Sequence, residues 1–266
     1  PCIDCNKYMK FRHLLDWAEA HGMEYVVTGH YARVEQDAAT GRWLLKKGLD
    51  EGKDQSYVLY NLTQEQLAHI RLPLGALHKT EVREIAQEHS FINAQKHDSQ
   101  DICFVPDGDY ARFMEQFTGK HYPAGDFLDQ SGKVVGTHSG AVRYTLGQRK
   151  GLGLGGGPWF VTDKDIERNI IYVSHTDACH GLYGTEFHLT GFHFITADPW
   201  KGAPEVDVLF KIRHTERPRP GHMVRQPDGR FLITSPTPVQ GIAPGQFGVL
   251  YTADGKICAG SGEIRF

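Results

Sequence analysis

Glu24-Tyr25-Val26-Val27-Thr28-Gly29-His30-Tyr31 is a short β-branched run that ends in a glycine and a histidine. The run predicts a buried strand, and before it Lys10–His21 carries apolar residues at helical spacing up to the stop signal Gly22. A helix that feeds a buried strand is half of a βαβ unit, and open parallel sheets bind ligands beyond the carboxyl ends of their strands. We therefore expect Gly29 and His30 to lie at a ligand site. The alternative for His30 is a hydrogen-bonded structural histidine.

The composition narrows the class of protein. The 266 residues include 29 Lys and Arg against 32 Asp and Glu, a net charge of −3. This charge argues against nucleic-acid binding over the whole protein surface but is compatible with a local basic patch. No apolar run approaches the roughly 20 residues of a membrane span, and no export leader is recognisable. Five cysteines are too few for a disulfide scaffold, so we expect a protein of the reducing cytoplasm with no membrane partner.

Local signals predict the elements that follow the first strand. Trp43-Leu44-Leu45 favours the return strand of a hairpin, Thr63-x-x-Gln66 is a capping box for a short helix, and Thr80–His89 has helical spacing. Asp107–Phe117 predicts a further helix with one apolar stripe, which we interpret as core packing. The stripe consists of Tyr110, Phe113, Met114 and Phe117.

The composition changes at Thr118, where helical periodicity fades and Gly and Pro become frequent. We predict three domains: the remainder of an α/β domain over residues 1–117, a small β-rich central domain over 118–182, and a C-terminal β-barrel over 183–266. Asn169–Val173 is the expected strand of the central domain. Four strands are expected in the barrel: Val206–Ile212, Phe231–Thr234, Phe247–Tyr251 and Lys256–Ala259.

Two groups of cysteines are candidates for chemistry. Cys103 lies in Asp98-Ser99-Gln100-Asp101-Ile102-Cys103-Phe104, between polar and bulky apolar neighbours. Cys2-x-x-Cys5 has the spacing of a zinc or redox pair, but no second CxxC or paired histidines follow nearby to complete a metal site. The alternative is that Cys5 acts with the distant Cys103, but on composition alone buried cysteines remain the favoured interpretation for both. Cys179 and Cys258 are expected to be structural.

Two further motifs have weaker meanings. Gly151–Gly156 matches G-x-G-x-x-G, but Gly157-Pro158-Trp159 follows where a dinucleotide site needs a helix, so we reject that motif. We expect instead a flexible, functional loop carried by Thr145–Lys150, whose two cations could contact a phosphate. Arg213–Pro220 is a basic stretch inside the expected barrel, which favours nucleic-acid binding about as much as a solvated loop.

Six motifs resemble, in order, those of the tRNA-specific 2-thiouridylase family, and together they extend over essentially the whole chain. They are Cys5-Asn6 with Lys10-Phe11, Thr28-Gly29-His30-Tyr31, Lys53-Asp54-Gln55-Ser56, Asp98-Ser99 with Ile102-Cys103-Phe104, Tyr144–Gly153, and Pro244-Gly245-Gln246.

The resemblance implies both fold and chemistry. The fold would be α/β, with part of a Rossmann-like parallel sheet domain of the adenine-nucleotide alpha hydrolase kind, a small central domain and a β-barrel. Such enzymes use ATP, with Mg²⁺, to adenylate the C2 oxygen of the wobble uridine, position 34 of tRNA. Cys103 would receive a persulfide from a sulfur-carrier protein or a cysteine desulfurase, and Cys5 would release the sulfur and end in a disulfide with Cys103.

The resemblance also assigns binding residues. It places Gly29 on ATP and no metal on the protein, and it brings nine residues near tRNA: Pro1, Cys2, His30, Lys53, Asp54, Gln55, Arg213, His214 and Gln246.

This sequence departs from the family pattern at two positions. First, the family's phosphate loop, Ser-Gly-Gly-Val-Asp-Ser, is absent, so we expect a truncated chain that by itself does not thiolate tRNA. Second, Cys2 stands where some members have an aspartate proposed to assist proton transfer. The competing functions are a tRNA-binding fragment without catalysis and a zinc or thiol-redox protein built on Cys2 and Cys5.

Overall fold

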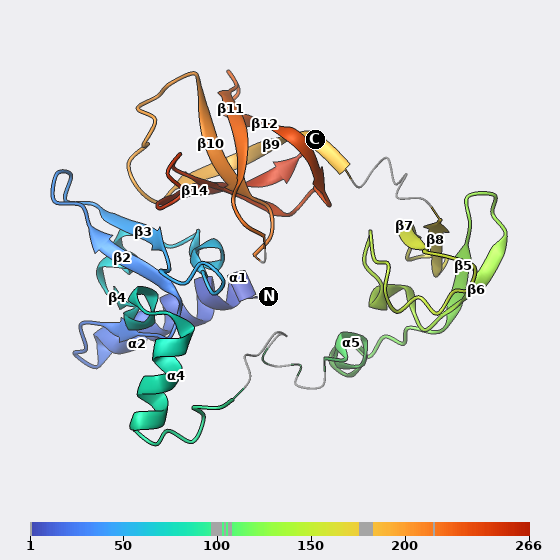
Figure 1. The fold of residues 1–266 in the computed structure, drawn as a ribbon, viewed down its shortest axis with the longest axis horizontal. Coiled ribbons are helices and arrows are strands. Elements are labelled where there is room, and N and C mark those ends of the chain that lie inside the picture. The colour runs from blue at the N-terminus through green and yellow to red at the C-terminus, as the bar shows by residue number, and fades with distance from the viewer. Residues whose placement is uncertain (1, 97–102, 104, 106–107, 176–182, 215) are drawn as a thin grey trace. The chain divides into compact units, whose positions relative to one another are not determined.

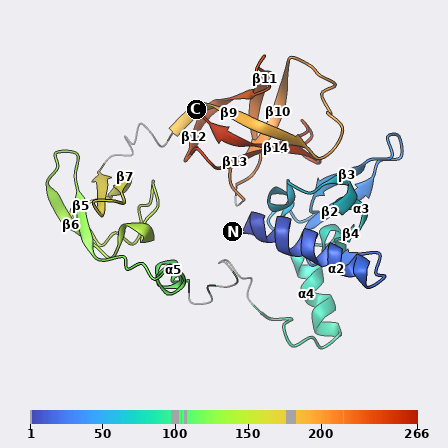
Figure 2. The same ribbon diagram turned by 180° about the vertical axis from the view of Figure 1, so that it is seen from behind.

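The computed structural model describes residues 2–96, 103, 105, 108–175, 183–214 and 216–266. The chain divides into two compact units. Unit 1 contains residues 1–98, 186–237 and 243–266, and unit 2 contains residues 99–185 and 238–242. Figures 1 and 2 show the helices and strands of each. Among the described residues, no helix has the length and apolar character needed to cross a membrane. The two predicted boundaries between the three domains stay a prediction.

Helical structure begins earlier than the sequence predicted. The first turn is α1 (Cys2–Asp4), a π-helical stretch η1 (Cys5–His13) continues it, and α2 (Leu14–Ala20) completes it. The expected start at Lys10 was therefore wrong, whereas the stop is close to Gly22, which has a φ of 70°. The side chain of Phe11 is fully buried and fixes this helix on the core of unit 1.

The predicted strand is present as β1 (Val26–Val27), which pairs in parallel with β4 (Ile70–Arg71). The expectation that it is buried was wrong, because 63% of Val27 is exposed. A parallel pair is nevertheless the arrangement that a βαβ unit requires, and it puts Gly29 and His30 just beyond a carboxyl strand end.

The hairpin and the capped helices are confirmed. The strands β2 (Ala32–Gln36) and β3 (Trp43–Lys47) pair antiparallel, and Thr63 and Gln66 form both bonds of a capping box on α3 (Gln64–Ala68). The helix predicted from Thr80 is α4 (Lys79–Glu88). Two 3-10 turns lie between these elements: η2 (Ser56–Leu59) and η3 (Pro73–Ala76).

Unit 2 contains a four-stranded sheet in the order β6-β5-β8-β7. Its elements are β5 (Gly125–Leu128), β6 (Val134–His138), the 3-10 turn η4 (Ala141–Arg143), β7 (Phe160–Asp165) and β8 (Ile170–Ser174). The expected strand at Asn169–Val173 is confirmed as β8. The Gly-rich loop Gly151–Gly156 leads to strand β7 and no helix follows it, as the rejection of a dinucleotide motif required.

The helix predicted over Asp107–Phe117 is α5 (Tyr110–Thr118), but its apolar stripe is not a core. Phe117 is 83% exposed, and Tyr110 and Met114 are each about two-fifths exposed. Helical spacing of apolar residues identifies a face of a helix and does not show that another element covers it.

The C-terminal part is a closed six-stranded barrel in the order β10-β11-β12-β9-β14-β13. Its strands are β9 (Tyr183–Phe194), β10 (Glu205–Lys211), β11 (Arg219–Arg225), β12 (Phe231–Gln240), β13 (Phe247–Tyr251) and β14 (Cys258–Arg265). The four predicted strands correspond to β10, β12, β13 and β14. The fold is thus a Rossmann-like α/β part, a central domain and a β-barrel, as the sequence predicted.

Candidate functional site

A cleft of about 720 Å³ lies inside unit 1, where the first helix and η2 face the barrel. Three of the predicted tRNA contacts line it: Arg213 and His214, which follow β10, and Gln246, which precedes β13. Lys7 and Asn61 line it from the α/β side. Residues that are far apart in the sequence therefore meet in one cleft.

Amide oxygens and aromatic rings give this cleft its chemical character. Gln246 Oε1 and Asn61 Oδ1 are buried without a hydrogen-bond partner in the described structure, so each can accept a bond from a ligand. Tyr60 and Phe247 also line the cleft, with ring centroids 5.0 Å apart, and offer apolar faces. Acceptors beside aromatic faces suit a planar molecule with an N–H group.

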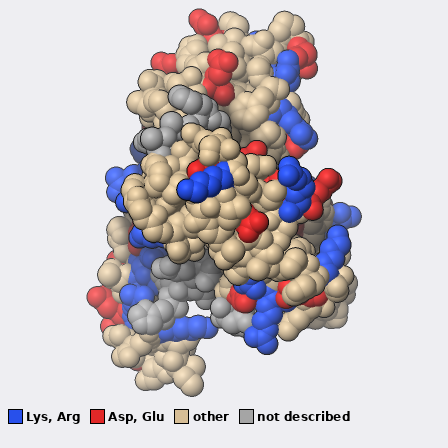
Figure 3. Space-filling model, turned by 90° about the vertical axis from the view of Figure 1, so that its right-hand side faces the viewer, with Lys and Arg blue, Asp and Glu red and all other residues tan. Residues whose placement is uncertain are grey.

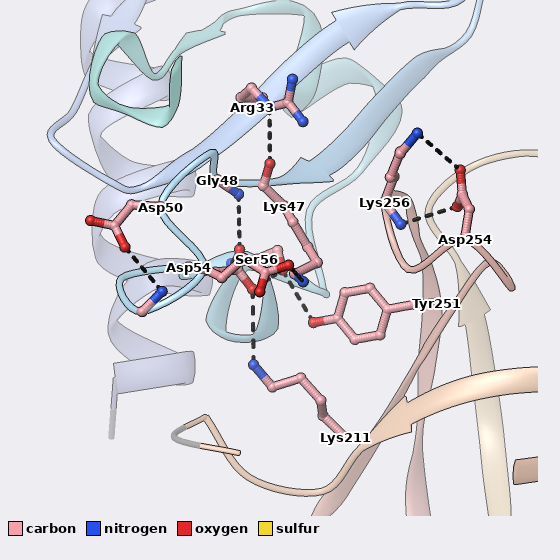
Figure 4. A network of polar contacts seen from close by, with 12 residues as sticks. Arg33, Lys47, Gly48, Asp50, Asp54, Ser56, Lys211, Tyr251, Asp254 and Lys256 are labelled. Atoms are coloured by element: carbon pink, nitrogen blue, oxygen red, sulfur yellow. Dashed lines mark hydrogen bonds and ion pairs between the residues drawn. The ribbon is translucent and has the colours of Figure 1, made fainter. Parts of the chain in front are cut away.

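Asp54 is a predicted tRNA contact whose side chain is turned inward (Figure 4). Its Oδ1 accepts from the backbone N–H groups of Gly48 and Ser56 at 3.0 and 3.1 Å, and its Oδ2 accepts from Ser56 Oγ at 2.9 Å. Lys211 Nζ lies 3.9 Å from the same oxygen, and both side chains are at least 96% buried. An action of Asp54 on RNA therefore has to be indirect, through the loop that it holds.

Burial dominates the electrostatics around this pair. It lowers the pKa of Lys211, and the attraction of Asp54 opposes that shift only in part. Burial also raises the pKa of Tyr251, whose hydroxyl lies 3.1 Å from Ser56 Oγ. The pKa of His214 is lowered by loss of solvent around its ring and by the nearby Lys211, although part of the residue reaches the surface.

Gln55 and His30 are connected through Tyr31. Gln55 Oε1 accepts from the Tyr31 backbone N–H at 2.9 Å, and the Gln55 N–H donates to the Tyr31 carbonyl at 2.8 Å. His30 is 7% exposed, its Nδ1 lies 2.8 Å from Thr28 Oγ1, and burial lowers its pKa to about 4, with the Lys10 charge contributing. The imidazole is therefore neutral at pH 7, and its geometry matches the structural-histidine alternative.

The remaining predicted residues are partly or fully accessible. Gly29 is exposed, and Lys53 is half-buried in the loop before η2. Cys2 is exposed in α1, while Cys5 is half-buried at the start of η1, and the adjacent Asn6 donates from Nδ2 to the Val58 carbonyl at 3.2 Å. Pro1 lies outside the described residues.

The cysteines of the two units have different surroundings. Cys103 is an exposed, free thiol in unit 2, and Cys258 is a fully buried free thiol in β14, as expected for a structural residue; Cys179 lies outside the described residues. Burial raises the pKa of Cys258, so this thiol stays protonated. In the part of the chain that the structure describes, no three metal-binding side chains gather around Cys2 and Cys5 or elsewhere.

The sequence interpretation missed Tyr57, Lys211 and Asn61, which shape or support the cleft. Lys211 had a usable signal, because a lysine at the end of an apolar strand needs an anion if it is buried. Tyr57 and Lys211 contact partners that are distant in sequence, Ile212 and Asp54 respectively. On the face drawn in Figure 3, Lys and Arg side chains are interspersed with Asp and Glu, in agreement with the small net charge.

The chain combines a Rossmann-like domain, a small central sheet and a barrel, which is the set of domains of a class of tRNA-modifying enzyme. Residues 1–107 match the tRNA methyl transferase HUP domain, residues 111–175 match the tRNA methyl transferase PRC-barrel domain, and residues 185–264 match the aminomethyltransferase beta-barrel domain. The chain belongs to the tRNA-specific 2-thiouridylase family.

The relatives that support this membership align over nearly the whole chain. One is tRNA-specific 2-thiouridylase MnmA 1 of Bacteroides thetaiotaomicron, with 46% identity over 266 residues, 99% of this chain and 74% of that protein. Another is tRNA-specific 2-thiouridylase MnmA 2 of Caldanaerobacter subterraneus subsp. tengcongensis, with 44% identity over 266 residues, 100% of this chain and 71% of that protein.

Proposed function

We propose that this chain carries the RNA-binding cleft and the two catalytic cysteines, Cys5 and Cys103, of a tRNA 2-thiouridylase. Such an enzyme replaces the C2 oxygen of the wobble uridine by sulfur. The observation that carries the proposal is the cleft that gathers Arg213, His214 and Gln246. A flipped-out uridine presents one N3–H donor and a π face, and the cleft presents unpaired amide acceptors beside aromatic rings. Arg213 supplies a cation for the RNA backbone.

In the proposed chemistry, Cys103 is the sulfur carrier. Its thiolate takes the outer sulfur of a donor persulfide and releases the donor thiol, which leaves Cys103 with an S–SH group. Cys5 then attacks the inner sulfur, forms the Cys5–Cys103 disulfide and frees hydrosulfide, which adds at C2 of the uridine; in the other order, the outer sulfur adds at C2 first. The exposure of Cys103 fits exchange with a protein or small-molecule donor.

ATP fits the described residues in part. Gly29 is exposed beyond the end of β1, where its backbone can approach a nucleotide. When bound, with Mg²⁺, ATP supplies the adenylyl group that makes the C2 oxygen a leaving group. The 266 residues contain no Ser-Gly-Gly-Val-Asp-Ser phosphate loop, so we expect the chain by itself to bind tRNA without forming AMP.

The first experiment measures tRNA binding and AMP release by the purified chain. We expect tRNA binding that weakens about tenfold or more in Arg213→Ala and in Gln246→Ala, because each loses a contact in the cleft. Arg230→Ala is the matched control, since Arg230 is a barrel arginine paired with Asp228 away from the cleft. Equal loss in all three variants, or no tRNA binding at all, would contradict the proposal, and robust AMP release would refute the expected inactivity.

The second experiment tests the thiols by mass spectrometry after treatment with a persulfide donor. The unmodified chain should release sulfide and gain a Cys5–Cys103 disulfide, Cys5→Ser should keep a persulfide on Cys103, and Cys103→Ser should show neither product. A disulfide between Cys2 and Cys5 instead, or stoichiometric zinc in the purified chain, would favour the redox or zinc alternative.

A further inference from the structure

The hydroxyl of Tyr57 contacts the barrel at one end of two neighbouring strands, β10 and β13, which pair antiparallel up to Lys211 and Val249. Tyr57 lies in η2, it is 6% exposed, and its hydroxyl is 2.9 Å from the carbonyl oxygen of Ile212 and 3.1 Å from that of Phe247. A hydroxyl has one hydrogen, so it donates to the two carbonyls in a shared bond. Ile212 directly precedes Arg213, and Phe247 directly follows Gln246.

Tyr57 also contacts the Arg213 segment through its ring. The ring centroid is 6.4 Å from that of His214 and 5.7 Å from Lys211 Nζ. Burial raises the pKa of Tyr57 to about 12, with Glu216 contributing and Arg213 opposing, so the hydroxyl keeps its proton and acts as a donor at neutral pH. A protonated, buried phenol with two backbone acceptors is suited to holding other groups in place.

We propose that Tyr57 is a positioning residue for RNA recognition. Its single hydroxyl holds the backbone beside Arg213 and beside Gln246, and thereby presents both side chains to the cleft. The inference rests on the proposed function for what the cleft binds, whereas the restraint on the two barrel segments does not depend on it.

Tyr251 offers a matched control. Its ring is fully buried in the same hydrophobic cluster, and its hydroxyl also has a hydrogen-bond partner, Ser56 Oγ at 3.1 Å. That partner is the first residue of η2, next to Tyr57, and is not part of the Arg213 or Gln246 segments (Figure 4). Tyr251→Phe therefore removes a buried hydroxyl without releasing either segment.

The restraint is tested without RNA by hydrogen–deuterium exchange on the purified 266-residue chain. In Tyr57→Phe, we expect amides in the segments 212–214 and 246–248 to exchange about fivefold faster, the change that loss of one hydrogen bond produces. Tyr251→Phe should leave these segments unchanged. Unchanged exchange in Tyr57→Phe, or equal acceleration in both variants, would overturn the inference.

The link to recognition is tested by a double-mutant cycle on tRNA affinity. We expect Tyr57→Phe to weaken binding about five- to tenfold and to have little further effect in the Arg213→Ala, Gln246→Ala background, because it acts through those residues. Full additivity would overturn the positioning role while leaving the proposed function intact. Absence of tRNA binding by the unmodified chain would instead refute the proposed function, and the exchange measurement would still decide whether Tyr57 restrains the segments.

Discussion

Acidification should destabilise the fold through His30. Its imidazole is buried, and its pKa falls from the ordinary 6.5 to about 4 because burial disfavours the cation and Lys10 repels it. Between pH 6.5 and 4 the folded state therefore binds fewer protons at His30 than the unfolded state does. The stability that the neutral imidazole contributes is complete above pH 6.5 and is lost as the pH falls towards 4. A change of one in pKa corresponds to about 1.4 kcal/mol of free energy of unfolding. The fall in the pKa of His30 from 6.5 to about 4 therefore corresponds to about 3 kcal/mol, of which about 2 kcal/mol is lost by pH 5.

The assay is urea denaturation at pH 7, 6 and 5, followed by tryptophan fluorescence, on the unmodified chain and on His30→Asn. The asparagine side chain can keep a bond to Thr28 Oγ1, as His30 Nδ1 does, but it does not titrate. Subtracting the two stabilities cancels the other titrating groups. We expect the difference to change by about 2 kcal/mol between pH 7 and pH 5. A difference that does not vary with pH would refute the buried, neutral histidine.

Two further substitutions test buried parts of unit 1 by the same denaturation assay. Lys211→Met leaves Asp54 buried without its cation, but three hydrogen bonds to the carboxylate remain, so we expect a loss of about 2 to 3 kcal/mol, most of it recovered in the Asp54→Asn, Lys211→Met double variant. If the double variant is as unstable as the single, the pair is not the cause. Gly75→Ala would place a Cβ 1.8 Å from the backbone oxygen of Ala32, so we expect a loss of about 3 kcal/mol, whereas Gly155→Ala meets nothing within 4 Å and should cost less than about 1 kcal/mol. Equal stability of the two glycine variants would contradict the close approach at Gly75.

Elements defined by local rules were predictable from the sequence. The capping box of Thr63 and Gln66 depends only on residues three positions apart, and Phe247–Tyr251 coincides with strand β13. The α5 stripe failed because its pattern describes one helix and carries no information about a neighbouring element. The buried strand at Val27 failed for the same reason, since burial is a property of the assembled sheet.

The candidate site was predictable only as a set of residues. The family resemblance placed Arg213, His214 and Gln246 among nine residues near tRNA, and in the structure these three line one cleft. It did not indicate Tyr57, because the bond from Tyr57 to Ile212 spans 155 residues and no local pattern reports such a contact. Asp54 shows the opposite failure. A charged residue in a loop was expected to contact RNA at the surface, but its carboxylate is buried beside Lys211 of a distant strand.

The segment from Asp54 to Val58 supports both halves of the proposed chemistry. Its Val58 carbonyl accepts from Asn6, the neighbour of Cys5, and its Tyr57 hydroxyl holds the carbonyls beside Arg213 and Gln246. A covalent chain of five residues cannot shift one of these contacts far without disturbing the next, because four of its five residues are buried and Gln55 is half-buried. The position of the Cys5 thiol and the position of the proposed RNA contacts therefore share one physical origin. Small changes in this segment should alter sulfur transfer and tRNA affinity together, although none of its side chains is proposed to touch a reacting atom.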